Sequence, residues 1–269
     1  MNSNIIVQEE AKDIRAIARM ALKDNWVNVT IGFFVFYVLD TVMPEILSVI
    51  FRSASYQIPY SINSVFDSTS IPTTDVSFVA DLYTLVVSGA LMVGLCSFFL
   101  AFFRRKDVNP ANVFNGFENF GKALGLFLIY MLKIFAWSLL LIVPGIIAAI
   151  RYSQCFFILA DDPSKGVMQC IEESKFHMFG NKGRYFYLGL TFIGWMILAQ
   201  IPSSIVANFT NGGIIGLVLD VVMCIPVYFV YAYMYTSETV FYDLVTGKLV
   251  AKKAEPEIAY EEPPRTTEY

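Results

Sequence analysis

Residues 122–161, KALGLFLIYMLKIFAWSLLLIVPGIIAAIRYSQCFFILAD, decide the fold, because this apolar run is interrupted near its middle by Pro144 and Gly145. About 20 helical residues cross the hydrocarbon core of a bilayer, so the run is roughly two crossings long. If it forms one bent helix, the chain crosses a membrane five times. If Pro144 and Gly145 form a tight helical hairpin, the chain crosses six times.

The composition of the whole chain is typical of a polytopic membrane protein. Hydrophobic residues make up 56% of the 269 residues and charged residues only 16%, unlike a soluble domain with one core. The net charge of -4, without a basic arm, argues against nucleic-acid binding. We therefore expect an all-α fold, a membrane helical bundle with amphipathic interfacial helices, whose main partner is the lipid bilayer.

Six apolar segments have the composition of membrane spans, and three amphipathic segments lie beside them. Asn109-Pro110 and Asp162-Pro163 are good starts for two of the amphipathic helices. Residues 52–77 are polar and predict an exposed loop, while residues 248–269 predict a disordered cytoplasmic tail after a single membrane domain at 1–247. The expected spans are 26–51, 78–103, 123–143, 146–160, 185–207 and 213–235, and the expected interfacial helices are 8–23, 110–121 and 163–179.

The basic residues support the six-span interpretation. With six spans, all 19 Lys and Arg residues except Arg52, Lys133 and Arg151 fall on one side of the membrane. Five spans would put two of the basic clusters outside. Because basic residues accumulate on the cytoplasmic side, the count favours six spans with both termini in the cytoplasm.

Motifs over nearly the whole chain up to the tail, from Ala18-Arg19 and Asn25-Trp26 near its start to Pro144-Gly145 and Gly180-Asn181-Lys182 in its second half, resemble those of a bacterial family of uncharacterised integral membrane proteins, domain of unknown function 975. The resemblance implies a six-span protein of the bacterial plasma membrane, and it carries no known activity. The same half is similar, more loosely, to the membrane domain of some glycerophosphodiester phosphodiesterases, which would be a membrane-embedding module without catalytic residues. The family-like motif comprises Pro144, Gly145, Tyr152, Ser153, Asp161, Pro163, Ser174, Gly180, Asn181 and Lys182.

The chain offers few residues for catalysis. His177 is the only histidine, so the paired histidines of a zinc protease are missing. The four cysteines have no CxxC spacing, and no phosphate-binding loop or nucleophile elbow is present. We expect no enzymatic activity, no cofactor and no metal site.

Ionisable residues inside the expected spans are the remaining candidates for function, above all Asp40, Lys133, Arg151 and Asp220. Each costs about 2.5–3.5 kcal/mol in lipid, so it should face protein or water. Their estimated depths predict two pairs, Asp40 with Lys133 and Arg151 with Asp220. Such residues either line a polar path for a charged substrate or orient the helices by structural pairing.

Two hypotheses follow from these observations. The first is a non-enzymatic scaffold or accessory subunit with a possible protein partner at the cytoplasmic face. The alternative is a small transporter or lipid-handling protein that uses the charges in its spans. The sequence shows no clear inverted repeat, which favours the first hypothesis. The sequence does not indicate an oligomeric state.

A pair of glycines around the start of the third apolar segment is relevant to helix packing. Gly121 and Gly125 have a spacing that permits close helix contact.

Overall fold

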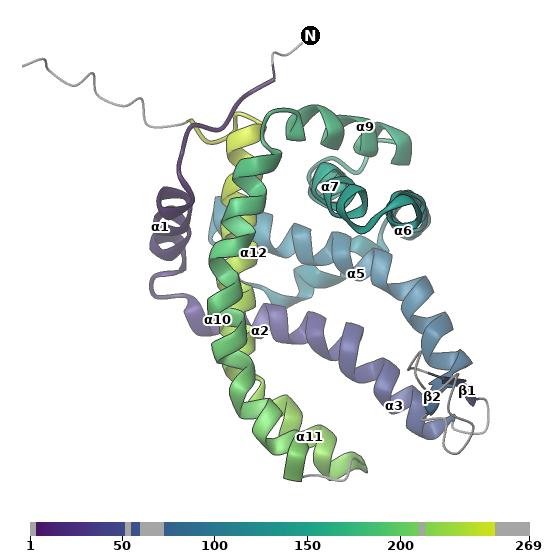
Figure 1. The fold of residues 1–269 in the computed structure, drawn as a ribbon. Helices are drawn as coiled ribbons and strands as arrows, with labels where there is room; N and C mark the ends of the chain where they lie inside the picture. The colour runs from purple at the N-terminus through teal and green to yellow at the C-terminus, as the bar shows by residue number, and fades with distance from the viewer. Residues whose placement is uncertain (1–3, 52–54, 60–72, 210–212, 251–269) are drawn as a thin grey trace, which may run out of the picture.

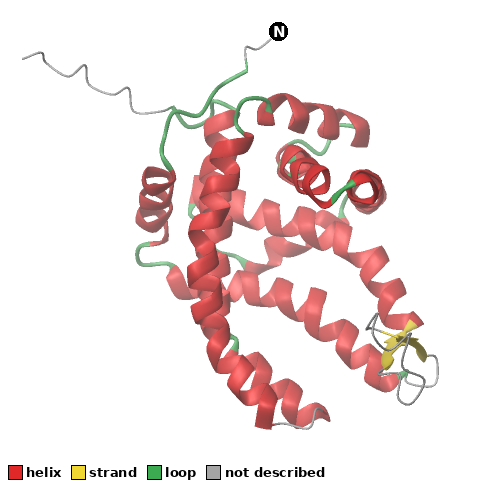
Figure 2. Cartoon of the chain, viewed as in Figure 1, coloured by secondary structure: helices red, strands yellow, loops and turns green. Residues whose placement is uncertain are grey.

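The computed structural model describes residues 4–51, 55–59, 73–209 and 213–250. This part of the chain is helical apart from one short hairpin (Figures 1 and 2), which confirms the all-α fold class. Residues 251–269 of the predicted tail lie outside it. The helices are α1 (Ala11–Leu22), α2 (Trp26–Tyr37), η1 (Val38–Val42), α3 (Met43–Ile50), α5 (Phe78–Arg105), η3 (Pro110–Phe117), α6 (Phe120–Leu140), α7 (Ile142–Tyr152), α8 (Cys155–Asp161), α9 (Val167–Met178), α10 (Lys182–Phe209), α11 (Gly213–Met223) and α12 (Ile225–Val245).

Five helical segments among the described residues are long and apolar enough to cross a membrane, and they correspond to the first five predicted spans. These helices indicate a membrane protein. The sixth predicted span is divided at Cys224 into α11 and α12, and Pro226 lies in the first turn of α12. The five segments are Trp26–Ile50, Phe78–Arg105, Phe120–Leu140, Ile142–Asp161 and Lys182–Ile205.

The apolar run at 122–161 folds back on itself, so the predicted hairpin is confirmed. The chain turns at Leu141, whose extended backbone separates α6 from α7, and Pro144 and Gly145 follow in the first turn of α7. A single bent helix over this run is therefore wrong. Three contacts show that the two arms are antiparallel, namely Ser138 with Gly145, the Lys133 ammonium 5.9 Å from the centre of the Tyr152 ring, and the rings of Tyr130 and Phe156 with centres 5.2 Å apart.

The helices form three hairpins that diverge from one end of the molecule (Figure 1). The first pairs α2, η1 and α3 with α5, the second pairs α6 with α7 and α8, and the third joins α10 to α11 and α12. In Figure 1 the first and third hairpins point in different directions, whereas α6 and α7 are seen end-on. The last turns of α5, α8 and α12 form the common end, with α1 beside α12 and α9 beside α8. We call this end the base.

Strands β1 (Ser55–Pro59) and β2 (Thr73–Ser77) lie at the tip of the first hairpin, within the predicted polar loop. They pair antiparallel, with Ser55 opposite Ser77 and Pro59 opposite Thr73. Helix α3 precedes β1 and α5 follows β2, so the contact between these two helices brings the two strands together. The loop prediction did not include this pairing, because neither segment has the length or apolar alternation of a typical strand.

Helix α12 lies at the centre of the packing, since it contributes to all three apolar clusters of the core. The predicted apolar face of α1 is confirmed, because Ala11, Ile14, Ala18 and Ala21 are all buried. This face packs on α10 and α12, so protein covers the surface that we expected to face lipid. The helix begins at Ala11, three residues later than predicted.

The other two amphipathic segments also differ in detail from the prediction. Residues 110–117 form the 3-10 helix η3, capped as predicted by the Asn109 side chain, which accepts a hydrogen bond from the Ala111 amide at 3.0 Å. The third helix, α9, begins only at Val167. Asp162 instead closes a local turn by accepting a hydrogen bond from the Ser164 amide at 3.1 Å. An Asp-Pro pair can form a turn as well as a helix start, which explains why α9 begins later than predicted.

Candidate functional site

The densest group of charges in the described chain joins three helix ends at the base. Arg104, in the last turn of α5, donates a hydrogen bond of 2.6 Å to Asp161 at the end of α8. Its Nε lies 3.1 and 3.2 Å from the two carboxylate oxygens of Asp243 on α12, and its Nη2 also bonds Asp243. Tyr242 donates to Asp161 at 2.9 Å, and Lys248 bonds the same oxygen. We call these five residues the ionic latch.

The ionic latch has the properties of a structural element. The side chain of Asp243 is only 4% exposed and that of Asp161 13%, so both need the positive charge of Arg104. Two carboxylates face one guanidinium and one ammonium, so the charges balance within the group. Because its donors and acceptors bond one another, the latch holds α5, α8 and α12 together at the base.

A second motif residue, Asn181, fixes the amino-terminal segment to the base. It is fully buried between α9 and α10, and its amide group makes three hydrogen bonds. The Val7 amide donates to it at 2.9 Å, and it donates to the carbonyls of Ile5 and His177 at 2.8 and 2.7 Å. Gly180, with φ of +81°, makes the turn before it. This Gly-Asn pair thus ends α9 and also docks residues 5–7.

The remaining motif residues also occupy structural positions. Ser174 is fully buried, accepts from the Gln154 amide at 3.3 Å and donates to the Arg151 carbonyl at 3.0 Å, so it ties α9 to the break between α7 and α8. Ser153 lies in that break and Tyr152 is buried beside it. The Pro163 carbonyl accepts from Lys122 at 2.5 Å. Lys182 begins α10.

Asp40 and Lys133 do not pair, so this prediction is wrong. Asp40 lies in η1, a π-helical turn between α2 and α3, and accepts a hydrogen bond of 2.8 Å from the Ser88 hydroxyl of α5. The Lys133 ammonium lies instead over the Tyr152 ring in the second hairpin. The two residues belong to different hairpins, and their estimated depths could not show this.

The second predicted pair, Arg151 with Asp220, does not form an ion pair in the described chain either. Asp220 lies beside Cys224 and within electrostatic range of Glu45, another carboxylate. Arg151 and Lys133 both interact with Glu172 on α9. Hydrogen bonds from Lys175 lower the pKa of this exposed carboxyl, and the charges of Lys133 and Arg151 lower it further. Helix α9 lies across the second hairpin and supplies the counter-charge.

The structure also holds a residue that the sequence analysis did not identify. Glu238, on α12 just beyond the predicted sixth span, interacts with Tyr130, Tyr185 and Cys96, which come from three other helices. It lines a small cavity with Tyr185 between α10 and α12. Among the described residues no group of three His, Cys, Asp or Glu side chains is placed to hold a metal ion. The base therefore offers a set of interhelical ties.

Comparisons with known proteins give one match. Residues 134–248 match the family model described as "Protein of unknown function (DUF975)". This range contains the second hairpin from Ile134 onward, all ten motif residues and the part of the ionic latch contributed by Asp161, Tyr242, Asp243 and Lys248. No curated protein and no solved structure matches the chain. The looser similarity to phosphodiesterase membrane domains is therefore not supported.

Proposed function

We propose that this chain belongs to the DUF975 family, whose model matches residues 134–248, and that it is a non-catalytic integral membrane protein of the bacterial plasma membrane that acts as a scaffold or accessory subunit. The observation that carries this proposal is how the motif residues are used. Asp161, Ser174 and Asn181 bond protein groups at the base, as expected of residues that maintain a framework.

The hairpin tips support a membrane-embedded arrangement. Around the turn of the second hairpin, residues 139–143 are 65–78% exposed and all apolar. On the third hairpin, Trp195, Ile197 and Leu198 are 56–66% exposed. Exposed apolar surface of this extent suits contact with lipid or with another membrane helix. We propose that the hairpins are embedded in the membrane, that the tip of the first hairpin reaches the outer surface, and that the base, with both termini, faces the cytoplasm.

Thiol labelling in intact cells distinguishes this proposal from a transporter. The four native cysteines are all buried, so background labelling by a membrane-impermeant maleimide should be low. We expect F51C, at the outer end of α3, to be labelled from outside, and F179C, at the base, only in inside-out vesicles. K133C and R151C should not be labelled from outside. Labelling of either at a rate close to that of F51C would establish a solvated path and overturn the scaffold proposal.

The partner expected of a scaffold would meet an outward surface of the base. Met168 and Phe176 on α9 and Phe179 just after it are 43–73% exposed, although they lie at the end predicted to be cytoplasmic. Glu172 and Lys175 add charges to the same surface. Apolar residues surrounded by charges are typical of a protein contact.

We expect a photo-crosslinking residue at position 168 or 179 to give the same discrete protein adduct in cells. The matched control is position 140 at the hairpin tip, where Leu140 is 69% exposed and crosslinks should go to lipid. A diffuse adduct pattern that is equal at all three positions would contradict a specific partner at α9.

A further inference from the structure

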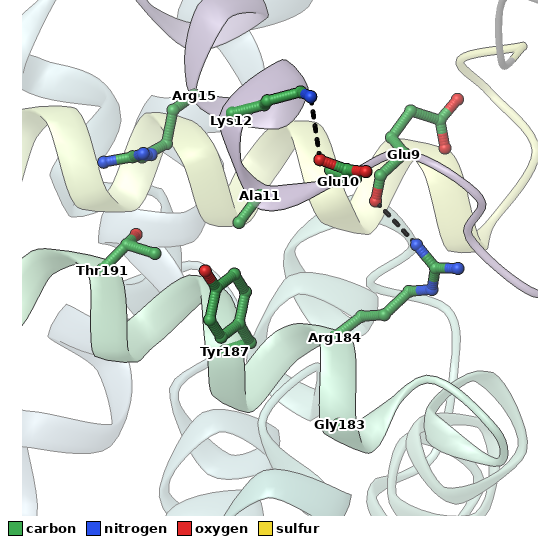
Figure 3. A pocket seen from close by; sticks show the side chains of 9 residues that line it. All are labelled: Glu9, Glu10, Ala11, Lys12, Arg15, Gly183, Arg184, Tyr187 and Thr191. Atoms are coloured by element: carbon green, nitrogen blue, oxygen red, sulfur yellow. Dashed lines mark hydrogen bonds and ion pairs between the residues drawn. The ribbon is translucent and has the colours of Figure 1, made fainter.

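A pocket of about 440 Å³ lies at the base between the start of α1 and the start of α10 (Figure 3). Its lining comprises Glu9 and Glu10 just before α1, Ala11, Lys12 and Arg15 of α1, and Gly183, Arg184, Tyr187 and Thr191 of α10. In Figure 3 the Arg15 side chain extends along the gap between the helices, opposite Thr191 and the Tyr187 hydroxyl. Hydrogen-bond donors from both helices therefore line the pocket, together with the carboxylates of Glu9 and Glu10.

Arg15 is the basic residue of the pocket whose buried donor lacks an acceptor. Its Nε atom has no hydrogen-bond partner among the described residues. Oε2 of Glu9 is likewise buried without a partner, but in Figure 3 the Glu9 carboxylate points away from the gap in which the Arg15 side chain lies. Lys12, by contrast, pairs with Glu10 at 3.0 Å, and Arg184 uses Nη1 to bond the carbonyls of Gln8 and Glu9 at 2.8 and 3.1 Å. A buried guanidinium donor without an acceptor is costly, so its position indicates that an anionic group completes the site.

The surroundings of the pocket indicate what bears that anion. Tyr187 is 61% exposed, and the outer surface of α10 continues from it as Leu190, Ile193 and Ile197, which are 42–66% exposed. This helix is a candidate span from Lys182 to Ile205. The pocket thus lies where a span meets the predicted cytoplasmic surface of the membrane. A phosphate held there would have its acyl chains beside the apolar surface of α10.

We propose that this pocket binds the phosphate of an anionic phospholipid. The Arg15 guanidinium bonds the phosphate oxygens, with Tyr187 and Arg184 beside it, and the acyl chains lie along α10. Charge-assisted hydrogen bonds from a guanidinium suit phosphate because several N–H groups point the same way. The bound lipid joins α1 to α10 at the membrane surface, and this proposal does not depend on the scaffold function.

The test is native mass spectrometry of the purified protein with phosphatidylglycerol, with phosphatidylcholine and with inorganic phosphate. We expect wild type to retain phosphatidylglycerol in preference to phosphatidylcholine. R15Q should weaken phosphatidylglycerol binding by about tenfold or more, the effect of one charge-assisted hydrogen bond. The matched control is K23Q, which removes one charge from an exposed residue at the other end of α1, outside the pocket, and should bind as wild type does.

A second variant tests the pocket without removing a native contact. Gly183 has open space where a side chain would begin, so G183D adds an anion beside the pocket without a clash, near a helix N-terminus where an acidic residue is favourable. We expect G183D to fold normally and to lose the lipid, and G183A to keep it. Equal lipid retention by R15Q, G183D and wild type would overturn the proposal. Displacement of the lipid by an equal concentration of inorganic phosphate would show a free-anion site and would also overturn it.

Discussion

Replacing Gly94 by alanine is expected to lower the free energy of unfolding by about 3 kcal/mol. At this position η3 crosses α5 with backbone against backbone. A Cβ atom on Gly94 would lie 1.7 Å from the Val113 carbonyl oxygen, and one on Gly116 would lie 1.9 Å from the Ala90 carbonyl oxygen. Main-chain atoms held in two helices cannot move aside as the end of a side chain can, so the two segments must separate.

The measurement is thermal unfolding in detergent, followed with a dye that fluoresces on reaction with thiols. Cys96, Cys155, Cys170 and Cys224 are all buried, so they react only when the core opens. For G94A, a loss of about 3 kcal/mol in the free energy of unfolding corresponds to an unfolding midpoint about 10 °C below that of wild type. The matched control is G121A, because a Cβ atom on Gly121 would have nothing within 4 Å; it should unfold at or slightly above the wild-type midpoint. Equal midpoints for G94A and G121A would show that the crossing is not tight.

Replacing Arg104 by methionine is expected to cost about 3 kcal/mol, because it leaves a buried carboxylate without its counter-charge. Methionine keeps much of the length of the side chain but none of the bonds to Asp161 and Asp243. Asp161 retains Lys248 and Tyr242 as partners. Asp243 is 4% exposed and has no other ion-pair partner among the described residues. The thiol-reactive dye should report a large decrease in the midpoint, and trypsin should cut faster at Lys248 as the end of α12 loosens.

Two further variants separate the loss of the latch from a general loss of charge. R105M changes the neighbouring residue, which is exposed, and should stay within about 0.5 kcal/mol of wild type. The double variant R104M/D243M removes the stranded carboxylate together with its partner and should recover part of the loss, because an apolar pair can replace a buried ion pair. If the double variant is no more stable than R104M, the latch does not act through Asp243.

The sequence predicted the architecture well where the information is local. A proline and a glycine inside an apolar run, together with the distribution of basic residues, were enough to identify the second hairpin. The turning point itself is Leu141, slightly before Pro144. The first turn of a helix tolerates proline, because its amide has no partner within the helix there. A Pro-Gly pair can therefore mark the first turn of the returning helix, about three residues after the turning point.

Contacts between distant segments were harder to predict. Counting residues along a span gives the depth of a charge but not the direction in which it faces, so Asp40 and Lys133 were assigned to each other although each faces another helix. The glycine spacing at 121 and 125 likewise suggested a close contact. A Cβ atom on Gly121 would nevertheless have nothing within 4 Å, and one on Gly125 would meet only a Val167 methyl group at 3.6 Å. The tight crossing involves Gly94 and Gly116, which are not on one helix and show no spacing signal.

The clamp that Asn181 places on residues 5–7 has a consequence for biosynthesis. During translation the amino-terminal residues leave the ribosome first, but their hydrogen-bonding partner follows about 175 positions later, when two hairpins have already been made. The earliest segment is thus among the last to find its place, and it remains undocked through most of insertion. A chaperone or a competing peptide has its best opportunity to intervene during that interval.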